Sequence, residues 1–241
     1  MISKEESFLY SRLPTYKKRL AGARKIIADA LHRCSNPYVA FSTGKDSTCT
    51  LHLVLEQVGN VDIVYFDADC ALPESIEMFE YYNAQGLNII KQKTEPLLET
   101  FRKHGLDNPR LEDITMKTTV YNPIKKLLAE NNYDCVFLGL RAGESKCRSK
   151  LLMSRGRLFE NKRDGIIECL PVGWWTERDV WAYIHTNNLM YNKAYDKGVE
   201  RVSYWAGETR KRKGRWVTLK QYWPQLYNRF AAEFPEVRNY V

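Results

Sequence analysis

The sequence lacks any run of about 18 consecutive apolar residues, the length that a membrane-spanning helix requires. Its first residues, Met-Ile-Ser-Lys-Glu-Glu, are acidic and polar, which is unlike a secretory signal peptide. We therefore expect a cytoplasmic protein that does not bind membranes. Internal repeats and low-complexity tracts are also missing, and 241 residues with 44% hydrophobic content suit one α/β domain with a short appendage.

Close pairs of cysteines are missing as well. The six cysteines form no CxxC or CC pair, and they are Cys34, Cys49, Cys70, Cys135, Cys147 and Cys169. Zinc sites and iron–sulfur clusters usually show at least one close pair of thiolates, so we expect neither cofactor. Most of these cysteines lie in apolar segments, which favours reduced, structural thiols. The four histidines are isolated in the sequence, and none of them predicts a ligand site.

Charge is unevenly balanced, because 37 Lys and Arg residues against 29 Asp and Glu residues give a formal net charge of +8. Such a protein attracts polyanions, but charge alone does not distinguish a nucleotide from RNA or DNA. Residues Arg201–Trp216, the basic tract, combine Arg, Lys and Gly with Tyr204, Trp205 and Trp216. The tract is either a solvated loop, a lid that brings cations to a substrate phosphate, or a surface that binds nucleic acid by phosphate contacts and stacking.

Strands alternate with helices along the chain. Apolar runs predict five strands, at residues 37–42, 61–66, 88–91, 133–139 and 165–170. Amphipathic patterns and capping residues predict helices at residues 11–31, 46–57, 72–83, 95–103, 120–130, 176–184 and 219–234, with a polar connection at 105–117. For the helix at 176–184 we expect a capping box formed by Thr176 and Asp179. The alternation predicts an α/β fold with a mainly parallel sheet covered on both faces.

The most informative segment is Tyr38-Val-Ala-Phe-Ser-Thr-Gly-Lys-Asp-Ser47, in which a buried strand ends in a small polar turn and a helix begins. This arrangement directs backbone N–H groups and the helix dipole at an anion. Lys45 can neutralise phosphate oxygens, while the hydroxyls of Ser42 and Ser47 donate to the same group. A glycine turn with a solvated lysine is the alternative. We favour the phosphate site.

Two other strand ends carry polar loops. Asp67 and Asp69 follow the second strand, and Arg141–Arg148 follow the fourth. Ligands of parallel sheets bind beyond the carboxyl ends of the strands, so we expect these loops to share one pocket with Ser42–Ser47. Asp67 either binds ribose hydroxyls, holds Mg²⁺ together with Asp69, or merely caps the next helix. The two arginines with Ser145 between them form either an anion clamp or a set of surface residues.

The turn after the first strand resembles the SGGKDS loop of the adenine nucleotide alpha-hydrolase superfamily, which includes N-type ATP pyrophosphatases, the ATP sulfurylase small subunit and phosphoadenylylsulfate (PAPS) reductases. Ser42 and residues Gly44–Ser47 match the loop, whereas Thr43 replaces a glycine. A β-branched residue disfavours positive φ, so either this position does not need that backbone or the loop differs locally.

Three further segments support the resemblance to the PAPS reductase family. Residues 139–148 are similar to its G-[IL]-R-x-x-[EQ]-S-x-x-R element, and Asp67 with Pro73-Glu-Ser75 to its D-TG-x-x-x-P-E pattern, with Ala68 and Asp69 in place of the threonine and glycine. Residues 170–198 resemble its P-[IL]-x-x-W-T-[ED]-x-D-V-W-x-Y-I segment and its P-Y-x-x-x-Y-x-x-G element. The resemblance implies a Rossmann-like three-layer sandwich of the HUP type with a five-stranded sheet.

The same resemblance implies domain bounds and site residues. Residues 1–35 would be a helical segment that packs on the core, 36–198 the PAPS reductase-like domain, and 199–241 a basic aromatic appendage. The implied nucleotide and phosphate ligands are Ser42, Thr43, Gly44, Lys45, Asp46, Ser47, Asp67, Gly139, Arg141 and Ser145. The implied catalytic residues are Lys45, Arg141 and Arg148. ATP or PAPS would be the nucleotide substrate, with Mg²⁺.

One departure from the family bears on the chemistry. PAPS reductases carry their nucleophilic cysteine in a C-terminal E-C-G-[IL]-H tail, and here no cysteine follows Gly198. Only Cys147, in the arginine loop, has an electropositive setting. Our leading hypothesis is therefore adenylation of an acceptor with release of pyrophosphate, in sulfur transfer or nucleic-acid modification. The alternatives are a PAPS or adenylylsulfate reductase that uses an external thiol, and a non-catalytic nucleotide-binding subunit that works with a protein partner.

Overall fold

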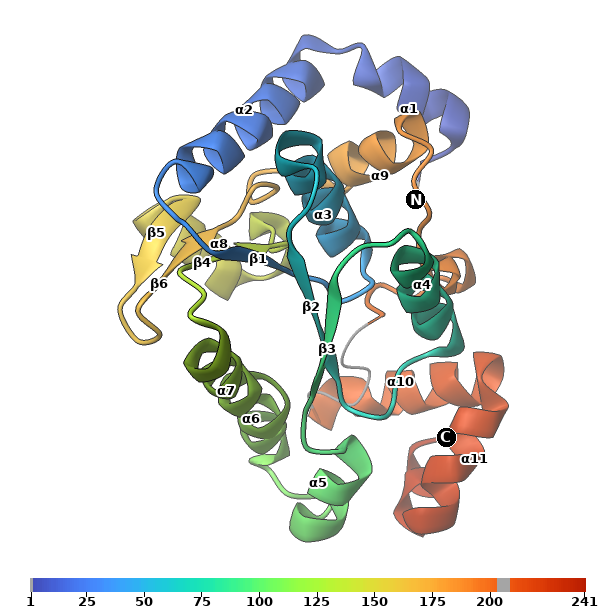
Figure 1. The fold of residues 1–241 in the computed structure, drawn as a ribbon. Helices are drawn as coiled ribbons and strands as arrows, with labels where there is room; N and C mark the ends of the chain where they lie inside the picture. Colours follow the sequence, from blue (N-terminus) through green and yellow to red (C-terminus); the bar gives the residue numbers. More distant parts are fainter. Residues whose placement is uncertain (1, 203–208) are drawn as a thin grey trace. The chain divides into compact units, whose positions relative to one another are not determined.

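The computed structural model describes residues 2–202 and 209–241 (Figure 1). Most of the basic tract lies outside the described side chains, so its three interpretations stay predictions, apart from the expected role of Trp216. The chain divides into two compact units. The first unit comprises Met1–Tyr65, Glu77–Ile90 and Leu128–Asn192, and the second comprises Phe66–Ile76, Lys91–Leu127 and Lys193–Val241. The domain bounds expected after residues 35 and 198 also stay predictions.

The strands form one six-stranded sheet in the order β3-β2-β1-β4-β6-β5. Their bounds are β1 Pro37–Ala40, β2 Asp62–Asp67, β3 Ile89–Lys93, β4 Cys135–Leu138, β5 Leu158–Asn161 and β6 Ile166–Cys169. Strand β1 pairs in parallel with β2 and β4, and β4 pairs in parallel with β6. The predicted α/β fold with a mainly parallel sheet is confirmed.

The predicted number of strands was too small by one. Strand β5 pairs antiparallel with β6 at the edge of the sheet, and a short turn connects the two. In that turn Asn161 accepts the N–H of Arg163 and donates to Asp164, and Gly165 has a φ of 70°. Strand β5 has only four residues, one of them acidic, so its alternation of apolar and polar residues is too weak to be recognised as a strand.

The helices of the first unit pack around β1 and β4. They are α1 Lys4–Ser11, α2 Pro14–Leu31, α3 Lys45–Val58, α8 Lys146–Arg155 and α9 Glu177–Thr186. Helix α1 contacts α9, and α3 contacts both α2 and α9 (Figure 1). The expected capping box of α9 is present, because Thr176 and Asp179 bond each other's backbone N–H groups. Residues 1–35 were expected to be helical, but no separate helix was predicted before residue 11, although Ser3 and Glu6 form a capping box at α1 too.

Among the described residues, four helices lie wholly within the second unit, and two more helices cross the boundary between the units. Within the unit are α5 Leu97–His104, α6 Leu111–Met116, α10 Thr209–Tyr222 and α11 Pro224–Glu233, and across the boundary are α4 Pro73–Ala84 and α7 Asn122–Asn131. The polar connection expected at 105–117 was wrong in part, since α6 and a π-helical segment, Lys117–Tyr121, occupy much of it. The single helix expected at 219–234 is interrupted at Trp223, because Pro224 lacks an N–H and begins a new helix.

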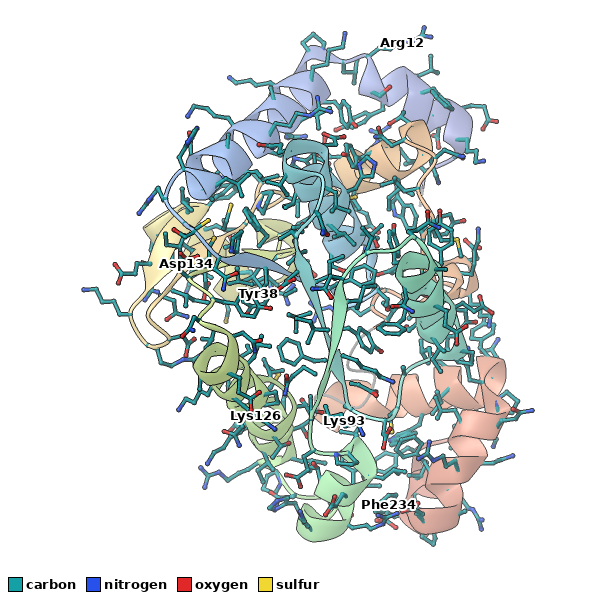
Figure 2. All side chains as sticks on the ribbon, in the orientation of Figure 1. Arg12, Tyr38, Lys93, Lys126, Asp134 and Phe234 are labelled. Atoms are coloured by element: carbon teal, nitrogen blue, oxygen red, sulfur yellow. The ribbon has the colours of Figure 1, made fainter. Side chains whose placement is uncertain are left out.

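The core of the first unit fixes the start of β1. Tyr38 is buried and its ring packs on Tyr133 at a centroid distance of 4.8 Å. Next to it, the carboxylate of Asp134 accepts the backbone N–H groups of Ser35 at 2.7 Å and Asn36 at 2.9 Å (Figure 2). These bonds hold the chain in place where it enters β1, so the loop after β1 starts from a rigid strand.

Aromatic rings form the core of the second unit. Phe101 of α5 packs on Phe230 and on Phe234, which Figure 2 labels. Trp216 of α10 is 1% exposed and packs on Phe230 at 5.4 Å. The expectation that Trp216 stacks on a nucleic-acid base is therefore wrong, because its indole belongs to this core. In the part of the chain that the structure describes, no helix is both long and apolar enough to cross a membrane.

Candidate functional site: the loops after β1 and β4

The turn between β1 and α3 is closed by its own hydroxyl groups. Helix α3 begins at Lys45, with Gly44 as N-cap. Ser47 Oγ donates to the Gly44 carbonyl at 2.9 Å and accepts the Ser42 N–H at 3.2 Å, and Thr48 Oγ1 donates to the same carbonyl at 3.0 Å. The first turn of a helix presents backbone N–H groups without partners inside the helix. The loop therefore holds a positively polarised helix end in a fixed position.

Thr43 adopts the left-handed backbone that the family's glycine would provide. Its φ is 59°, which is a genuine outlier for a β-branched residue. The side chain is 1% exposed, and its Oγ1 makes no hydrogen bond to any described residue. Of the two alternatives that the sequence left open, the loop has the positive φ in spite of the threonine. A strained backbone and a buried hydroxyl without a partner both occur at one residue of the predicted phosphate loop.

Asp69 repeats this behaviour at a second position where the family pattern has glycine. Its φ is 63°. Aspartate tolerates the left-handed region better than most residues, because its short polar side chain bonds locally. Thr43 and Asp69 thus both have a left-handed backbone, which glycine adopts without strain.

An ion pair joins the loop after β1 to the loop after β4. Arg141 Nε donates to Asp46 Oδ1, and both side chains are buried. Lys45 Nζ lies 3.7 Å from the other carboxylate oxygen of Asp46, so two buried cations meet this one carboxylate. Strands β2 and β4 flank β1 on opposite sides, which makes the β1–β4 edge the point where the strand order reverses. Two of the three loops expected to share a pocket thus meet at the predicted place.

Electrostatics keeps the arginine of this pair charged. Burial by itself would lower the pKa of Arg141, but the negative charge and the hydrogen bond of Asp46 raise it above its ordinary value. Burial raises the pKa of Asp46, and the charges of Arg141 and Lys45 offset part of that effect. A guanidinium that is buried, charged and held by a carboxylate is a pre-organised donor for an anion.

Gly139 allows β4 to end against the first turn of α3. A Cβ on this residue would lie 2.6 Å from Ser47 N and 2.7 Å from the carbonyl carbon of Asp46. Backbone atoms cannot yield to such an overlap as a flexible side chain can. Gly139 therefore sets the distance between the two loops, and its expected contact with a phosphate stays a prediction.

Glu144 organises the rest of the arginine loop. It accepts the backbone N–H of Arg141 at 2.9 Å and forms an ion pair with Arg148. Ser145 caps α8 by accepting the N–H of Arg148 at 3.2 Å. Burial raises the pKa of Glu144, but Arg148 and the Arg141 N–H outweigh this and lower it overall. No role was predicted for Glu144 from the sequence, although its place three residues after one arginine and four before the other indicated a bridge.

The predicted acids of the second strand belong to the second unit. Asp67 accepts the N–H of Asp69 at 3.1 Å and pairs with Lys91 Nζ at 2.9 Å. Among the residues that the structure describes, no group of three or more His, Cys, Asp or Glu side chains could hold a metal ion. A magnesium ion at Asp67 would have to displace the ammonium of Lys91, so these residues do not fit Mg²⁺ as they stand, and we derive no step through it.

Glu74, which belongs to the P-E part of the same pattern, has a structural role. Its carboxylate accepts Trp223 Nε1 at 2.8 Å and forms an ion pair with Lys197, all within the second unit. The lysine also lies 4.7 Å from the centre of the Trp223 ring. These contacts tie the start of α4 to the residue that precedes α11.

Five of the six thiols are poor nucleophiles. Burial raises the pKa of Cys70 to about 12, and it also raises the pKa of the other four, which are Cys34, Cys49, Cys135 and Cys169. Cys147 differs, because it is exposed in the first turn of α8 next to Arg148. It is thus an accessible thiol within the arginine loop, Arg141–Arg148.

Residues 36–207 match the family model described as the phosphoadenosine phosphosulfate reductase domain. This chain belongs to the PAPS reductase family. The family is part of the adenine nucleotide alpha-hydrolase superfamily and consists of nucleotide-binding proteins with a Rossmann-like fold. The matched range begins directly before β1 and includes the β1–α3 loop, the arginine loop and α9.

Relatives with similar sequences differ in length. An uncharacterized protein of Methanocaldococcus jannaschii is 30% identical over 205 residues, which are 81% of this chain and 42% of that protein. The chain thus spans less than half the length of that relative. The adenosine 5′-phosphosulfate reductase of Oceanobacillus iheyensis is 29% identical over 208 residues, covering 81% of this chain and 84% of the reductase.

Two solved structures share the fold. The PAPS reductase of Candida auris, solved as a phosphate complex, has a TM-score of 0.62 at 20% identity and covers 87% of this chain and 98% of its own. The FMN adenylyltransferase of Candida glabrata, in complex with FAD and pyrophosphate, has a TM-score of 0.61 at 12% identity. The match covers 83% of this chain and 68% of the adenylyltransferase chain. At these identities the likeness concerns the fold alone.

Proposed function

We propose that this PAPS reductase family member is an enzyme of the ATP pyrophosphatase or adenylyltransferase type, which binds ATP at the β1–α3 loop and adenylates an acceptor. The observation that carries the proposal is the Asp46–Arg141 ion pair, which places a buried guanidinium beside Lys45 at the start of α3. Backbone N–H groups, an ammonium and a guanidinium at one switch point suit the charged oxygens of a polyphosphate.

The reaction requires no nucleophilic side chain. An oxygen of the acceptor attacks the α-phosphorus of ATP, the bond to the bridging oxygen breaks, and pyrophosphate leaves with the negative charge while the acceptor proton passes to solvent. Lys45 and the first turn of α3 stabilise the charge that develops on the leaving group. Arg141, held by Asp46, orients the α-phosphate, and Arg148 adds a second guanidinium at the edge of the site.

The cysteines of the chain support this chemistry over thiol chemistry. Burial raises the pKa of five of the six thiols, so few of them are available as thiolates at neutral pH. A thiol mechanism needs a reactive thiolate, whereas attack by an acceptor oxygen on ATP needs groups that stabilise charge on the phosphates. Lys45 and Arg141 are groups of the second kind.

The experiment is release of pyrophosphate from ATP and Mg²⁺, with single-stranded oligonucleotides or small sulfur compounds offered as acceptors. Wild-type protein should release pyrophosphate, and Lys45→Met should lose at least about 90% of the rate, as expected for the loss of a transition-state contact of roughly 1.5–3 kcal/mol. Lys18→Met, which removes an exposed lysine of α2, is the matched control. If the protein binds ATP but releases no pyrophosphate with any acceptor, the result would favour the alternative of a non-catalytic nucleotide-binding subunit.

The second candidate is a reductase, and the exposure of Cys147 favours it. In this reaction the Cys147 thiolate attacks the sulfur of PAPS, the S–O bond breaks, and adenosine 3′,5′-bisphosphate leaves. An external thiol then attacks the resulting thiosulfonate, so sulfite is released and a mixed disulfide remains on the protein. Release of sulfite from PAPS with an added dithiol, and its loss in Cys147→Ser, would establish this function and replace the adenylation proposal.

A further inference from the structure

Helix α2 presents to solvent a face that consists almost entirely of cations. The apolar residues of the helix are buried, where it contacts α3 and β6 (Figure 1). Between residues 17 and 31 five residues are exposed, and all but one of them carry a positive charge. The five are Lys17, Lys18, Ala21, Arg24 and Lys25. The exposed residues of this stretch thus include no aromatic and no bulky apolar side chain.

The four cations surround the alanine. Residues three and four positions apart lie next to each other on the surface of a helix. Lys17 and Lys18 precede Ala21 by four and three positions, and the other two cations, Arg24 and Lys25, follow it by three and four. We call these four cations the α2 tetrad. Because the residue at their centre has only a methyl group, anionic groups have room to approach the helix between the four long side chains.

The α2 tetrad keeps most of its charge for a partner. Its two lysines at residues 17 and 18 make no ion pair with a described residue. Arg24 donates through Nε to Glu56 at 3.0 Å, and Lys25 pairs with Asp29 at 2.6 Å. Both pairs are exposed, and exposed pairs are weak, so a denser array of negative charge can replace these carboxylates. Residues 17–33 contain six Lys or Arg residues and one acid, which gives a net charge of +5.

The composition of this face distinguishes between kinds of polyanion. Surfaces for single-stranded nucleic acid stack unpaired bases on aromatic side chains, and specific protein interfaces are depleted in lysine and centre on aromatic anchors. The exposed residues of α2 described above offer neither. A duplex instead presents a rigid array of phosphates, with one negative charge per roughly 1.7 Å of its axis. Over the roughly 12 Å by which α2 rises from Lys17 to Lys25, a duplex carries about seven phosphate charges.

We propose that the exposed face of α2 is a binding surface for double-stranded nucleic acid, which the α2 tetrad holds by its phosphate backbone. Binding of this kind does not depend on base sequence and weakens steeply as the salt concentration rises. The surface goes beyond the proposed function and does not depend on it, because the α2 tetrad and the loops after β1 and β4 consist of different residues. It is also separate in sequence from the basic tract.

A substitution at the centre of the α2 tetrad tests the proposal most sharply. Ala21→Glu places a carboxylate between the four cations, so it should weaken the binding of a duplex roughly 10- to 100-fold at about 50 mM salt. The slope of log affinity against log salt should also fall in magnitude by about 1 to 2, because the carboxylate neutralises one or two cations that would contact phosphates. Fluorescence anisotropy with short labelled duplexes of DNA and of RNA measures both quantities, and wild-type protein should bind at least one of the two.

Two control variants separate local charge from side-chain size and from net charge. Ala21→Gln has the same length as the glutamate variant without its charge, and its affinity should stay within about threefold of wild-type. Ala129→Glu makes the same change of charge at an exposed position of α7, where Lys125 and Lys126 precede it by four and three positions. Its affinity should also stay within about threefold of wild-type.

The fold should not suffer from the test substitution. Glutamate is a good helix former, and at residue 21 its carboxylate can pair with Lys25 four positions later, so Ala21→Glu should unfold at or above the wild-type temperature. A loss of duplex binding in this variant therefore does not come from misfolding. ATP is held by other residues in our proposal, so Ala21→Glu, like Lys18→Met, should bind ATP with wild-type affinity.

Several results would overturn the inference. Wild-type protein that binds neither duplex at low salt is one, and an Ala21→Glu variant that binds as well as wild-type is another, since the duplex would then be held elsewhere. Equal losses in Ala21→Glu and Ala129→Glu, or in Ala21→Glu and Ala21→Gln, would also overturn it. The same holds if a single strand of equal length, or polyglutamate, binds wild-type protein as tightly as the duplex does.

Titration of the same samples with ATP keeps the two proposals apart. If the protein binds ATP but no duplex, only the surface on α2 is removed and the nucleotide site stands. If it binds the duplex with the expected loss in Ala21→Glu but does not bind ATP, only the proposed function is removed.

Discussion

Asp46 and Arg141, which are 95 positions apart in the chain, form a buried ion pair that joins the loop after β1 to the loop after β4. The carboxylate comes from the first turn of α3, and the guanidinium follows β4 by three residues. Each group is buried, so each depends on the other for its charge to be tolerated. The pair is the main polar connection between the two loops of the candidate site.

Removing one partner of this pair should destabilise the protein strongly. Asp46→Ala leaves a buried, charged guanidinium, and we expect a loss of about 3–5 kcal/mol in the free energy of unfolding. The double variant Asp46→Ala, Arg141→Ala should lose less than the sum of the two single variants. Urea unfolding measures all three. Asp29→Ala, which breaks the exposed Lys25–Asp29 pair, should cost less than about 1 kcal/mol; strictly additive losses at Asp46 and Arg141 would contradict the coupling.

A single methyl group at Gly139 should separate the two loops. Because its Cβ would overlap the backbone of Asp46 and Ser47, Gly139→Ala should cost about 1–3 kcal/mol in stability and also weaken ATP binding. Gly143→Ala is the matched control, since the nearest atom to its Cβ is Arg141 Nη1 at 3.9 Å. Chemical unfolding and ATP titration of both variants test this. Equal behaviour of the two alanines would show that the close approach at Gly139 is unimportant.

The buried hydroxyl of Thr43 should lower the stability of the free protein and strengthen the binding of ATP. Thr43→Val removes the buried hydroxyl but retains the shape, and it should stabilise the free protein by roughly 1 kcal/mol, because that hydroxyl makes no hydrogen bond to a described residue. If the hydroxyl donates to a bound phosphate, the same variant should bind ATP more weakly. Thr43→Gly should also be more stable, since glycine adopts a φ of 59° without strain. Calorimetric unfolding with and without ATP distinguishes these effects, and a valine variant that is both less stable and unchanged in affinity would refute the account of this residue.

Glu144 should make stability depend on pH in the acidic range. Its pKa in the folded protein lies below the ordinary value of 4.5, so the folded state favours the charged form. Its contribution is therefore fully present above about pH 4.5 and is lost as the pH falls through the folded pKa. Between pH 6 and pH 3, roughly, wild-type protein should lose more unfolding free energy than Glu144→Gln does. If the free energy of unfolding falls equally with pH in the two proteins, the Glu144 carboxylate makes no pH-dependent contribution to stability.

The sequence alone was sufficient for the elements whose signals are local. The buried run before Ser42 and the turn after it predicted β1, the loop and α3, and the Thr176–Asp179 capping box located α9. The local signal was too weak for β5, which is short and partly polar. For α1, the Ser3-x-x-Glu6 capping box was a signal that the helix prediction at 11–31 did not use. At Trp223 the sequence did carry a signal for a helix boundary, because Pro224 follows directly. The apolar pattern that continues across this position predicted one helix instead of two.

The connections within the candidate site could not be derived from local patterns. Lys45 and Arg141 were each predicted on the chemistry of their loops, but nothing in the sequence indicates that Asp46 is the residue that Arg141 bonds. The same holds for Gly139, whose importance depends on a backbone segment more than 90 positions away. Such contacts come from strand order, which brings β4 next to β1.

The most direct test of the account is calorimetric titration of ATP into wild-type protein, Lys45→Met and the control Lys18→Met. If the turn between β1 and α3 holds the phosphates, wild-type and Lys18→Met should bind with equal affinity, and Lys45→Met should bind roughly 10- to 100-fold more weakly, as expected for the loss of a charged hydrogen bond. Unchanged affinity in Lys45→Met, in a variant that unfolds at the wild-type temperature, would contradict the assignment of this loop as the nucleotide site.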